Sequence, residues 1–171
     1  LTEFKDDPKL VKAPDGGMWY LLFNTNVPAL KNSKIRRALV MAVDRKELVN
    51  NVLGGAERYS ETFVPAGIGM KGISKDFYEE VPTKQPDFNP EEAKKLLSEG
   101  LKEVGVSKLP ELEIIFGDSG NTKSIAEYIQ ENLRKNLGIE IKLGAITGKE
   151  RIQRTKQRDY QIAINNWTGD F

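Results

Sequence analysis

Apolar residues in the last third of the chain alternate between strand-like runs and a helix-like spacing. Short apolar runs at 112–116, 139–143 and 160–164 have the length of buried strands. Between them, residues 122–137 carry an apolar stripe at helical spacing, and residues 148–158 form a charged segment typical of an exposed helix. The order strand, helix, strand, helix, strand predicts parallel pairing of the three strands with right-handed crossovers.

The first part of the chain predicts one more strand and three helical segments. Residues 18–23 are apolar and aromatic enough to predict a strand that is buried on both faces. One helix is expected from Ile35, and a second begins at Asp44, with Glu47 at the third position after it as in a capping box. Asn89 followed by proline and two acidic residues is typical of the start of a third helix.

These elements predict a single lobe preceded by a short polar segment. The chain has 171 residues, which is enough for one domain with its own core. Residues 1–17 are read as a linker or edge segment, and residues 18–171 as one α/β lobe. Residues 56–88, rich in Gly and Pro, are the irregular part of that lobe. We expect a mixed, largely parallel sheet flanked by helices.

Composition restricts the function more than the fold. Lys and Arg total 26 against 25 Asp and Glu, so the net charge is +1 and a nucleic-acid partner is not expected. The chain contains no Cys and no His, so it lacks the thiolate nucleophile, the commonest general base and the commonest transition-metal ligands. Catalysis by Asp, Glu or Lys remains an alternative, but we expect no metal site, no cofactor and no enzyme activity.

The residues after the run 160–164 are the first candidates for a binding site. Ligands of parallel sheets bind at the carboxyl ends of strands, and Asn165, Asn166, Trp167 and Asp170 follow this strand. A carboxylate beside an indole holds an ammonium group through charge-assisted hydrogen bonds and the ring face. The alternative is that Asp170 is a turn residue next to a core tryptophan.

A second candidate is the turn at 117–121, which joins a predicted strand to a predicted helix. Its backbone N–H groups could hold an anion, although it lacks the spacing of a phosphate-binding loop. Asp118 and Asp170 both follow carboxyl ends of strands and could form an acid–base pair in an enzyme, whereas Asp159 lies at the opposite end. The alternative is that all three are solvated turn residues.

Five groups of residues occur in a fixed order along residues 18–171 and together resemble a known family. They are Asn24-Thr25-Asn26 with Pro28, Ile35 to Leu39, Ala42 to Val49 and Leu53 to Gly55; Phe63 to Gly67; Asn89 to Leu97; Ile129 to Leu133 with Leu137 to Glu140; and Asp159-Tyr160 with Trp167 to Phe171. They resemble the oligopeptide/dipeptide-binding proteins, the extracellular solute-binding proteins, family 5, of ABC importers.

The resemblance implies a fold, partners and a location. Members of this family have two lobes of the type II periplasmic-binding-protein-like fold and close around a ligand. This chain is similar to most of the second lobe, called domain III, so a first lobe is expected before Leu1 and further chain after Phe171. The implied ligand is a short peptide that is delivered to ABC permease subunits; an oligosaccharide or a metal chelate is the alternative. The implied location is the periplasm or, with a lipid anchor, the cell surface.

The resemblance also assigns roles to the candidate residues. Asp170 matches the aspartate that holds the α-ammonium group of the peptide, and Trp167 matches an aromatic position beside a side-chain pocket. Asn165 and Asn166 precede the tryptophan and are expected to reach the cleft. Ile164 stands where some peptide binders have a cationic side chain, which puts a carboxylate-binding role at that position in doubt.

Overall fold

A four-stranded sheet forms the centre of the molecule. The computed structural model describes residues 8–9, 11, 16–55, 57–65, 67–69, 77–80, 85–118 and 120–168. The strands are β1 (Gly17–Phe23), β2 (Leu112–Gly117), β3 (Ile141–Ile146) and β4 (Ile162–Thr168), arranged in the order β1-β4-β2-β3. Strand β2 is parallel to β3 and β4, and β1 is antiparallel to β4. The predicted mixed, largely parallel sheet is therefore confirmed.

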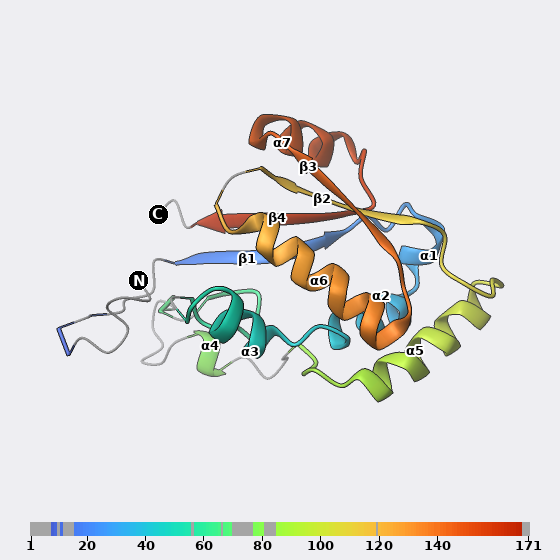
Figure 1. Cartoon of the computed structure of the whole chain (residues 1–171), viewed down its shortest axis with the longest axis horizontal. Coiled ribbons are helices and arrows are strands. Elements are labelled where there is room, and N and C mark those ends of the chain that lie inside the picture. The colour runs from blue at the N-terminus through green and yellow to red at the C-terminus, as the bar shows by residue number, and fades with distance from the viewer. Residues whose placement is uncertain are drawn as a thin grey trace.

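Helices cover both faces of this sheet. They are α1 (Pro28–Lys31), α2 (Ser33–Met41), α3 (Arg45–Glu47), the π-helical segment η2 (Leu48–Val52), α4 (Phe77–Glu80), α5 (Pro90–Glu103), α6 (Thr122–Leu137) and α7 (Gly148–Gln157). Helices α2, α5 and α6 lie on one face, and α7 lies on the other (Figure 1). None of the helices within the described ranges is long and apolar enough to cross a bilayer.

The main core lies between the sheet and α2, α5 and α6. Alternate strand residues point to the same face, and this core receives Ile114 and Phe116 from β2 and Ile162 and Ile164 from β4. The helices contribute buried residues that include Leu30, Ile35, Leu39, Ala93, Ile129 and Leu133. Ile115, between Ile114 and Phe116, is also buried, and by the same alternation its side chain points toward the opposite face, which α7 covers.

The helix boundaries follow the capping residues. The side chain of Asn89 accepts a hydrogen bond from the Glu92 N–H at the start of α5, as predicted. The side chain of Asp44 likewise caps the segment that begins with α3. Helix α6 ends at Gly138, which has a φ angle of 65°, a left-handed conformation that glycine adopts without a steric penalty.

Two strand predictions are wrong, and a third is displaced, since the strand expected at 139–143 lies at Ile141–Ile146. Strand β1 is not buried on both faces: it lies at the end of the sheet, and the Trp19 side chain is 46% exposed. Strand β4 does not end at Ile164 but continues to Thr168, because β1 pairs with it along the whole length from Phe23↔Ile162 to Gly17↔Thr168. The antiparallel neighbour extends β4 through polar residues that were expected to follow the strand.

Candidate functional site

The carboxyl ends of β2, β3 and β4 lie at one edge of the sheet, on the left in Figure 1. Helix α6 connects β2 to β3, which lies on one side of β2 in the sheet. Helix α7 connects β3 to β4, which lies on the other side of β2. Because α6 and α7 cover opposite faces, the connections diverge between β2 and β4. Ligands of open α/β sheets bind at such a switch point, outside the carboxyl ends of the strands.

Strands β2 and β4 separate at this switch point. They pair only at Ile114↔Ile162 and Ile115↔Ala163, and the place where they part beyond these residues is called the fork. Beyond Ala163, β4 continues in register with β1, while β2 continues beside β3 to Gly117. A backbone carbonyl of β4 in the fork therefore needs a hydrogen-bond donor from outside the β2–β4 ladder.

Arg151, in the first turn of α7, supplies that donor. One terminal guanidinium nitrogen donates to the Ile164 carbonyl oxygen at 3.4 Å, and the other donates to Asn166 Oδ1 at 3.3 Å. The Nε atom lies 3.7 Å from where a Cβ atom on Gly117 would be, which places the guanidinium beside the end of β2. Burial lowers the pKa of Arg151, and the neighbouring Tyr20 opposes this shift.

Sequence reasoning missed Arg151 because it assigned residues 148–158 to an exposed, charged helix. Most of α7 fits that description, and none of its residues is fully buried. A usable indication was present in the order of elements: a residue in the first turn of a helix that follows a parallel strand lies near the carboxyl edge of the sheet. Which cation of that turn would point into the fork depends on where β2 and β4 part.

Three of the four predicted site residues lie in β4 at this edge. Asn165 is half-buried opposite Tyr20, Asn166 is exposed, and the Trp167 side chain is 43% exposed. Because successive strand residues alternate between faces, Asn166 points away from the face shared by Asn165 and Trp167. Asp170 lies outside the described residues, so its position relative to Trp167 stays a prediction.

The structure does not bring the other candidate carboxylates together. Asp118 is exposed at the end of β2, and its side chain forms no hydrogen bond or ion pair with another described residue. Asp159 lies in the turn before β4, at the opposite edge, where Arg154 Nε is 3.3 Å from its Oδ2 atom. A catalytic pair of carboxylates is therefore not formed within the described ranges.

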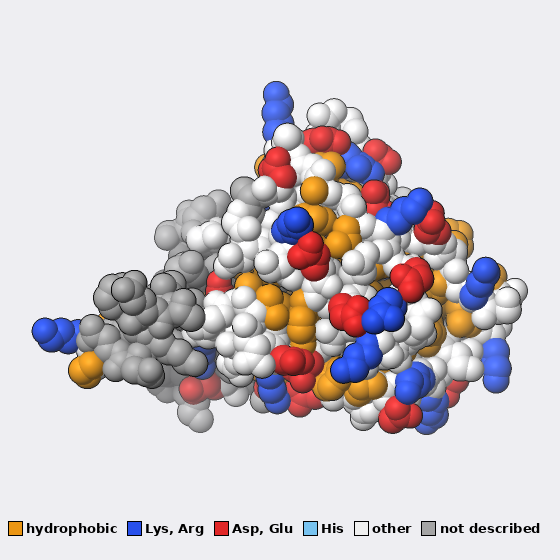
Figure 2. Space-filling model, in the orientation of Figure 1, with side chains coloured by type: hydrophobic (Ala, Val, Ile, Leu, Met, Phe, Trp, Pro, Cys, Tyr) orange, Lys and Arg blue, Asp and Glu red, His pale blue; other side chains and the backbone are white. Residues whose placement is uncertain are grey.

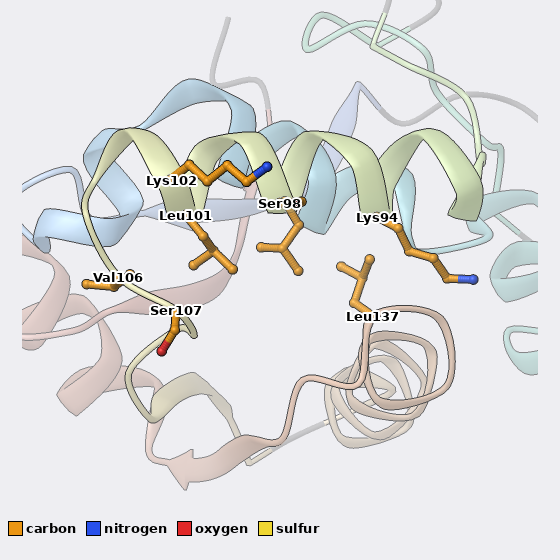
Figure 3. A pocket seen from close by; sticks show the side chains of 8 residues that line it. Lys94, Ser98, Leu101, Lys102, Val106, Ser107 and Leu137 are labelled. Carbon is orange, nitrogen blue, oxygen red and sulfur yellow. The ribbon is translucent and has the colours of Figure 1, made fainter.

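A surface pocket of about 370 Å³ lies away from the fork. It is formed between α5 and the end of α6, with Leu97, Leu101 and Leu137 as apolar residues and Lys94 and Lys102 from α5 (Figure 3). Leu137 precedes β3 and Val106 precedes β2, so this pocket is at the amino ends of the strands. It does not coincide with the edge where the candidate residues lie.

Charge is distributed evenly over the surface in view. Figure 2 shows acidic and basic side chains interspersed on this face, in agreement with 26 cationic and 25 acidic residues in the chain. Among the described residues, no group of three or more acidic side chains is placed to hold a metal ion.

The family model and two relatives that match this chain are named for solute or peptide binding. The family model of bacterial extracellular solute-binding proteins, family 5 Middle, matches residues 1–171. The oligopeptide-binding protein OppA of Bacillus subtilis (strain 168) is 32% identical over 174 residues, which cover 100% of this chain and 31% of that protein. The dipeptide-binding protein DppE of the same organism is 31% identical over 155 residues, covering 91% of this chain and 28% of DppE.

Solved structures agree with these matches. Listeria monocytogenes OppA bound to peptide has a TM-score of 0.87 to this chain at 27% identity, covering 99% of this chain and 34% of that chain. The chain spans less than a third of the length of the two Bacillus subtilis relatives, OppA and DppE. The predicted fold, a lobe of the periplasmic-binding-protein-like class, is confirmed by this similarity.

Proposed function

The chain belongs to the bacterial extracellular solute-binding proteins, family 5, and from this premise we propose that it is one lobe of a peptide-binding component of an ABC importer. The observation that carries the proposal is the match over the whole chain to relatives named for oligopeptide and dipeptide binding. In this proposal, residues 18–171 form most of one lobe, residues 1–17 are a linker or edge segment, and a second lobe completes the cleft.

Capture occurs by closure of the two lobes around an extended peptide. The fork supports this mechanism, because β4 beyond Ala163 no longer pairs with β2. An extended peptide that lies along Asn165 and Asn166 gains affinity from main-chain hydrogen bonds, which do not depend on its sequence. The released peptide then passes to the permease subunits of the importer.

Asp170 and Trp167 define the amino end of the peptide in this proposal. Asp170 pairs with the α-ammonium group, and Trp167 packs beside the first side chain. The exposed indole of Trp167 at the carboxyl edge supports a role in contact with ligand, because a core tryptophan would be covered by its own lobe.

Binding rather than catalysis is the proposed activity. Members of the matched family are solute-binding proteins. Asp118 is exposed, and its side chain has no partner among the described residues. Acid–base chemistry at this position would need a second group within hydrogen-bond reach. The place of action is outside the cytoplasmic membrane, either in the periplasm or at a lipid anchor on the cell surface.

The test uses the full-length protein and calorimetric titration with tri- to pentapeptides. Free-amine peptides and their N-acetylated forms are compared in the wild type, Asp170→Asn and Asp118→Asn. Acetylation and Asp170→Asn should each weaken binding by about 2 kcal/mol or more, the cost of leaving one partner of a buried charge pair. Asp118→Asn, a neutralised acid at the same edge, should bind like the wild type.

The outcomes separate the substrate class from the residue assignment. If no peptide binds to the wild type, the proposed substrate class is wrong, and oligosaccharides and metal chelates are titrated next. If peptides bind equally well to Asp170→Asn, the class holds but the assignment of Asp170 fails.

A further inference from the structure

Arg151 stands out among the cations of α7 because its contacts are neutral. It donates to the carbonyl oxygen of Ile164 and to the amide oxygen of Asn166. Arg154 lies one turn later and forms ion pairs instead. Its Nη2 atom is 3.7 Å from Glu113 Oε2, and its Nε atom is 3.3 Å from Asp159 Oδ2. Within the part of the chain that the structure describes, Arg151 forms no ion pair. A guanidinium also has more N–H donors than two oxygens use.

Two described acidic residues, one adjacent to Arg151 in the chain and one at the end of β2, do not pair with it. Glu150 precedes it in α7, and Asp118 follows Gly117 at the end of β2; both are exposed, and neither pairs with it. Arg151 is half-buried, so its charge has lost part of its hydration, and no described residue forms an ion pair with it. The pKa of Arg151, which burial lowers, agrees with this environment. An anion that reaches the fork would restore that compensation.

The position of the guanidinium indicates that such an anion would belong to a bound ligand. Arg151 lies between the carboxyl ends of β2 and β4, at the switch point where ligands of open α/β sheets bind. The surface around it includes the exposed Asn166 and the half-buried Tyr20. Because arginine binds carboxylates through two parallel hydrogen bonds, it selects this group more strongly than a lysine would.

Resting on the proposed function, we propose that Arg151 is a specificity residue that binds a carboxylate of the captured peptide. That carboxylate is either the terminal one or that of an Asp or Glu side chain, since both present the same pair of oxygens. Ile164 and Asn166 hold the guanidinium in position for it. Peptides with this carboxylate at the matching position are therefore preferred over their amide isosteres.

The test measures carboxylate selectivity in the full-length protein. Calorimetry compares the affinity for each peptide with the affinity for two amide isosteres of it. One isostere has a C-terminal amide, and the other has Asn or Gln in place of Asp or Glu. The variants are Arg151→Met, Arg151→Lys and the control Arg154→Met, whose parent side chain is already paired with Glu113 and Asp159. Thermal unfolding of each variant separates a loss of folding from a loss of selectivity.

Arg151→Met should weaken binding of the carboxylate peptide by roughly tenfold or more, while its amide isostere changes little. Arg151→Lys should retain part of the preference, and Arg154→Met should retain all of it. The peptide pair that responds identifies the source as the terminus or the side chain. If Arg151→Met weakens both members of every pair equally, Arg151 only supports the fold of β4, and the assignment is overturned. If the wild type binds no peptide, the proposed function fails and this inference falls with it.

Discussion

The hydroxyl oxygen of Tyr128 in α6 lies 2.8 Å from a carboxylate oxygen of Glu47 in α3. The same hydroxyl is 3.1 Å from the carbonyl oxygen of Asp44, so one side chain connects α6 to the first turn of the segment that begins at Asp44. Burial and the hydrogen bond to Glu47 raise the pKa of Tyr128, which keeps the hydroxyl protonated and able to donate.

Replacing Tyr128 by Phe should lower the free energy of unfolding by about 1 kcal/mol, the usual net value of one such hydrogen bond. Urea denaturation followed by circular dichroism measures the change. Tyr160→Phe is the matched control, because the Tyr160 side chain is half-buried and its hydroxyl forms no hydrogen bond with another described residue. Equal losses in the two variants would show that the bond to Glu47 contributes nothing.

The same residues show how far local sequence patterns predict this fold. The capping role of Asp44 was predicted correctly, and its side chain accepts from the N–H groups of Lys46 and Glu47. The capping-box role of Glu47 was wrong: the Asp44 N–H donates to Asn132 Oδ1 at 3.4 Å, and Glu47 binds Tyr128 instead. A cap within one turn is a local property, whereas a partner 81 residues away depends on packing that the sequence pattern does not contain.

Gly100, near the end of α5, should not tolerate alanine. A Cβ atom at this position would lie 2.6 Å from Ile35 Cγ1 and 3.1 Å from Asn32 Oδ1, the atom that caps α2. Alanine favours a helix interior by about 1 kcal/mol over glycine, but overpacking against α2 costs about 1–3 kcal/mol. We expect Gly100→Ala to lower the melting temperature.

Ser98→Ala is the control for Gly100→Ala, since Ser98 is exposed in the same helix. It gains helix propensity without a new contact and should leave the melting temperature unchanged or slightly higher. A higher melting temperature for Gly100→Ala would mean that α2 and α5 move apart without cost. The glycine inside the helical pattern was visible in the sequence, but the helix that approaches it was not.

Tyr59 should ionise at an unusually high pH. Its hydroxyl lies 2.6 Å from Asp87 Oδ1, and the Arg45 guanidinium lies 5.0 Å from the ring centroid. Burial, and then the hydrogen bond to Asp87, raise the pKa of Tyr59 to about 12, while Arg45 opposes the shift. Because the folded state holds this proton more tightly than the unfolded state, its stabilisation is complete below about pH 10 and is lost as the pH rises toward the folded pKa.

Tyrosinate absorbance measures the ionisation of Tyr59. Tyr59→Phe should remove a component that titrates near pH 12, where the pKa of Tyr59 lies. Asp87→Asn should move that component to lower pH, because it removes the charged acceptor. A titration curve that Asp87→Asn leaves unchanged would contradict the assignment of the raised pKa to this contact.

The candidate site could be predicted in part. The carboxyl edge and the three β4 residues followed from the order of strands and helices, because parallel strands end at the same edge. The fork and Arg151 did not follow, since they depend on β2 and β4 parting after Ala163. The length of β4 did not follow either, since it depends on pairing with β1, whose residues lie far from β4 in the sequence.

Arg158 should be replaceable by glycine with a gain in stability. It ends α7 with a φ angle of 59°, a left-handed conformation that costs a non-glycine residue about 1 kcal/mol. Glycine removes this cost, although greater freedom of the unfolded chain offsets part of the gain. Gly138→Ala, at the equivalent end of α6 with a φ angle of 65°, should have the opposite sign. Thermal unfolding measures both, and a lower melting temperature for Arg158→Gly would contradict the prediction.

Asn24 connects the end of β1 to the turn between α7 and β4. Its buried side chain donates to the carbonyl oxygens of Arg158 at 2.9 Å and Tyr160 at 2.7 Å, and its Oδ1 accepts from the Asn26 N–H at 3.1 Å. This residue opens the first group of residues that resembles the family. Its contacts give it a structural role at the edge opposite the fork.

Asn24→Asp should be strongly destabilising near neutral pH, because it removes both donors and places a carboxylate against two carbonyl oxygens. We expect a loss of about 3 kcal/mol in the free energy of unfolding. The native environment raises the pKa of the new carboxyl group, so the part of the penalty that comes from its charge is small below about pH 4 and grows as the pH rises. Urea denaturation at several pH values measures this dependence against Asn24→Ala, which also loses the donors but carries no charge. If the stability difference between the two variants is the same at about pH 4 and pH 7, the carboxylate does not face the two carbonyl groups, and the structural role of Asn24 is wrong.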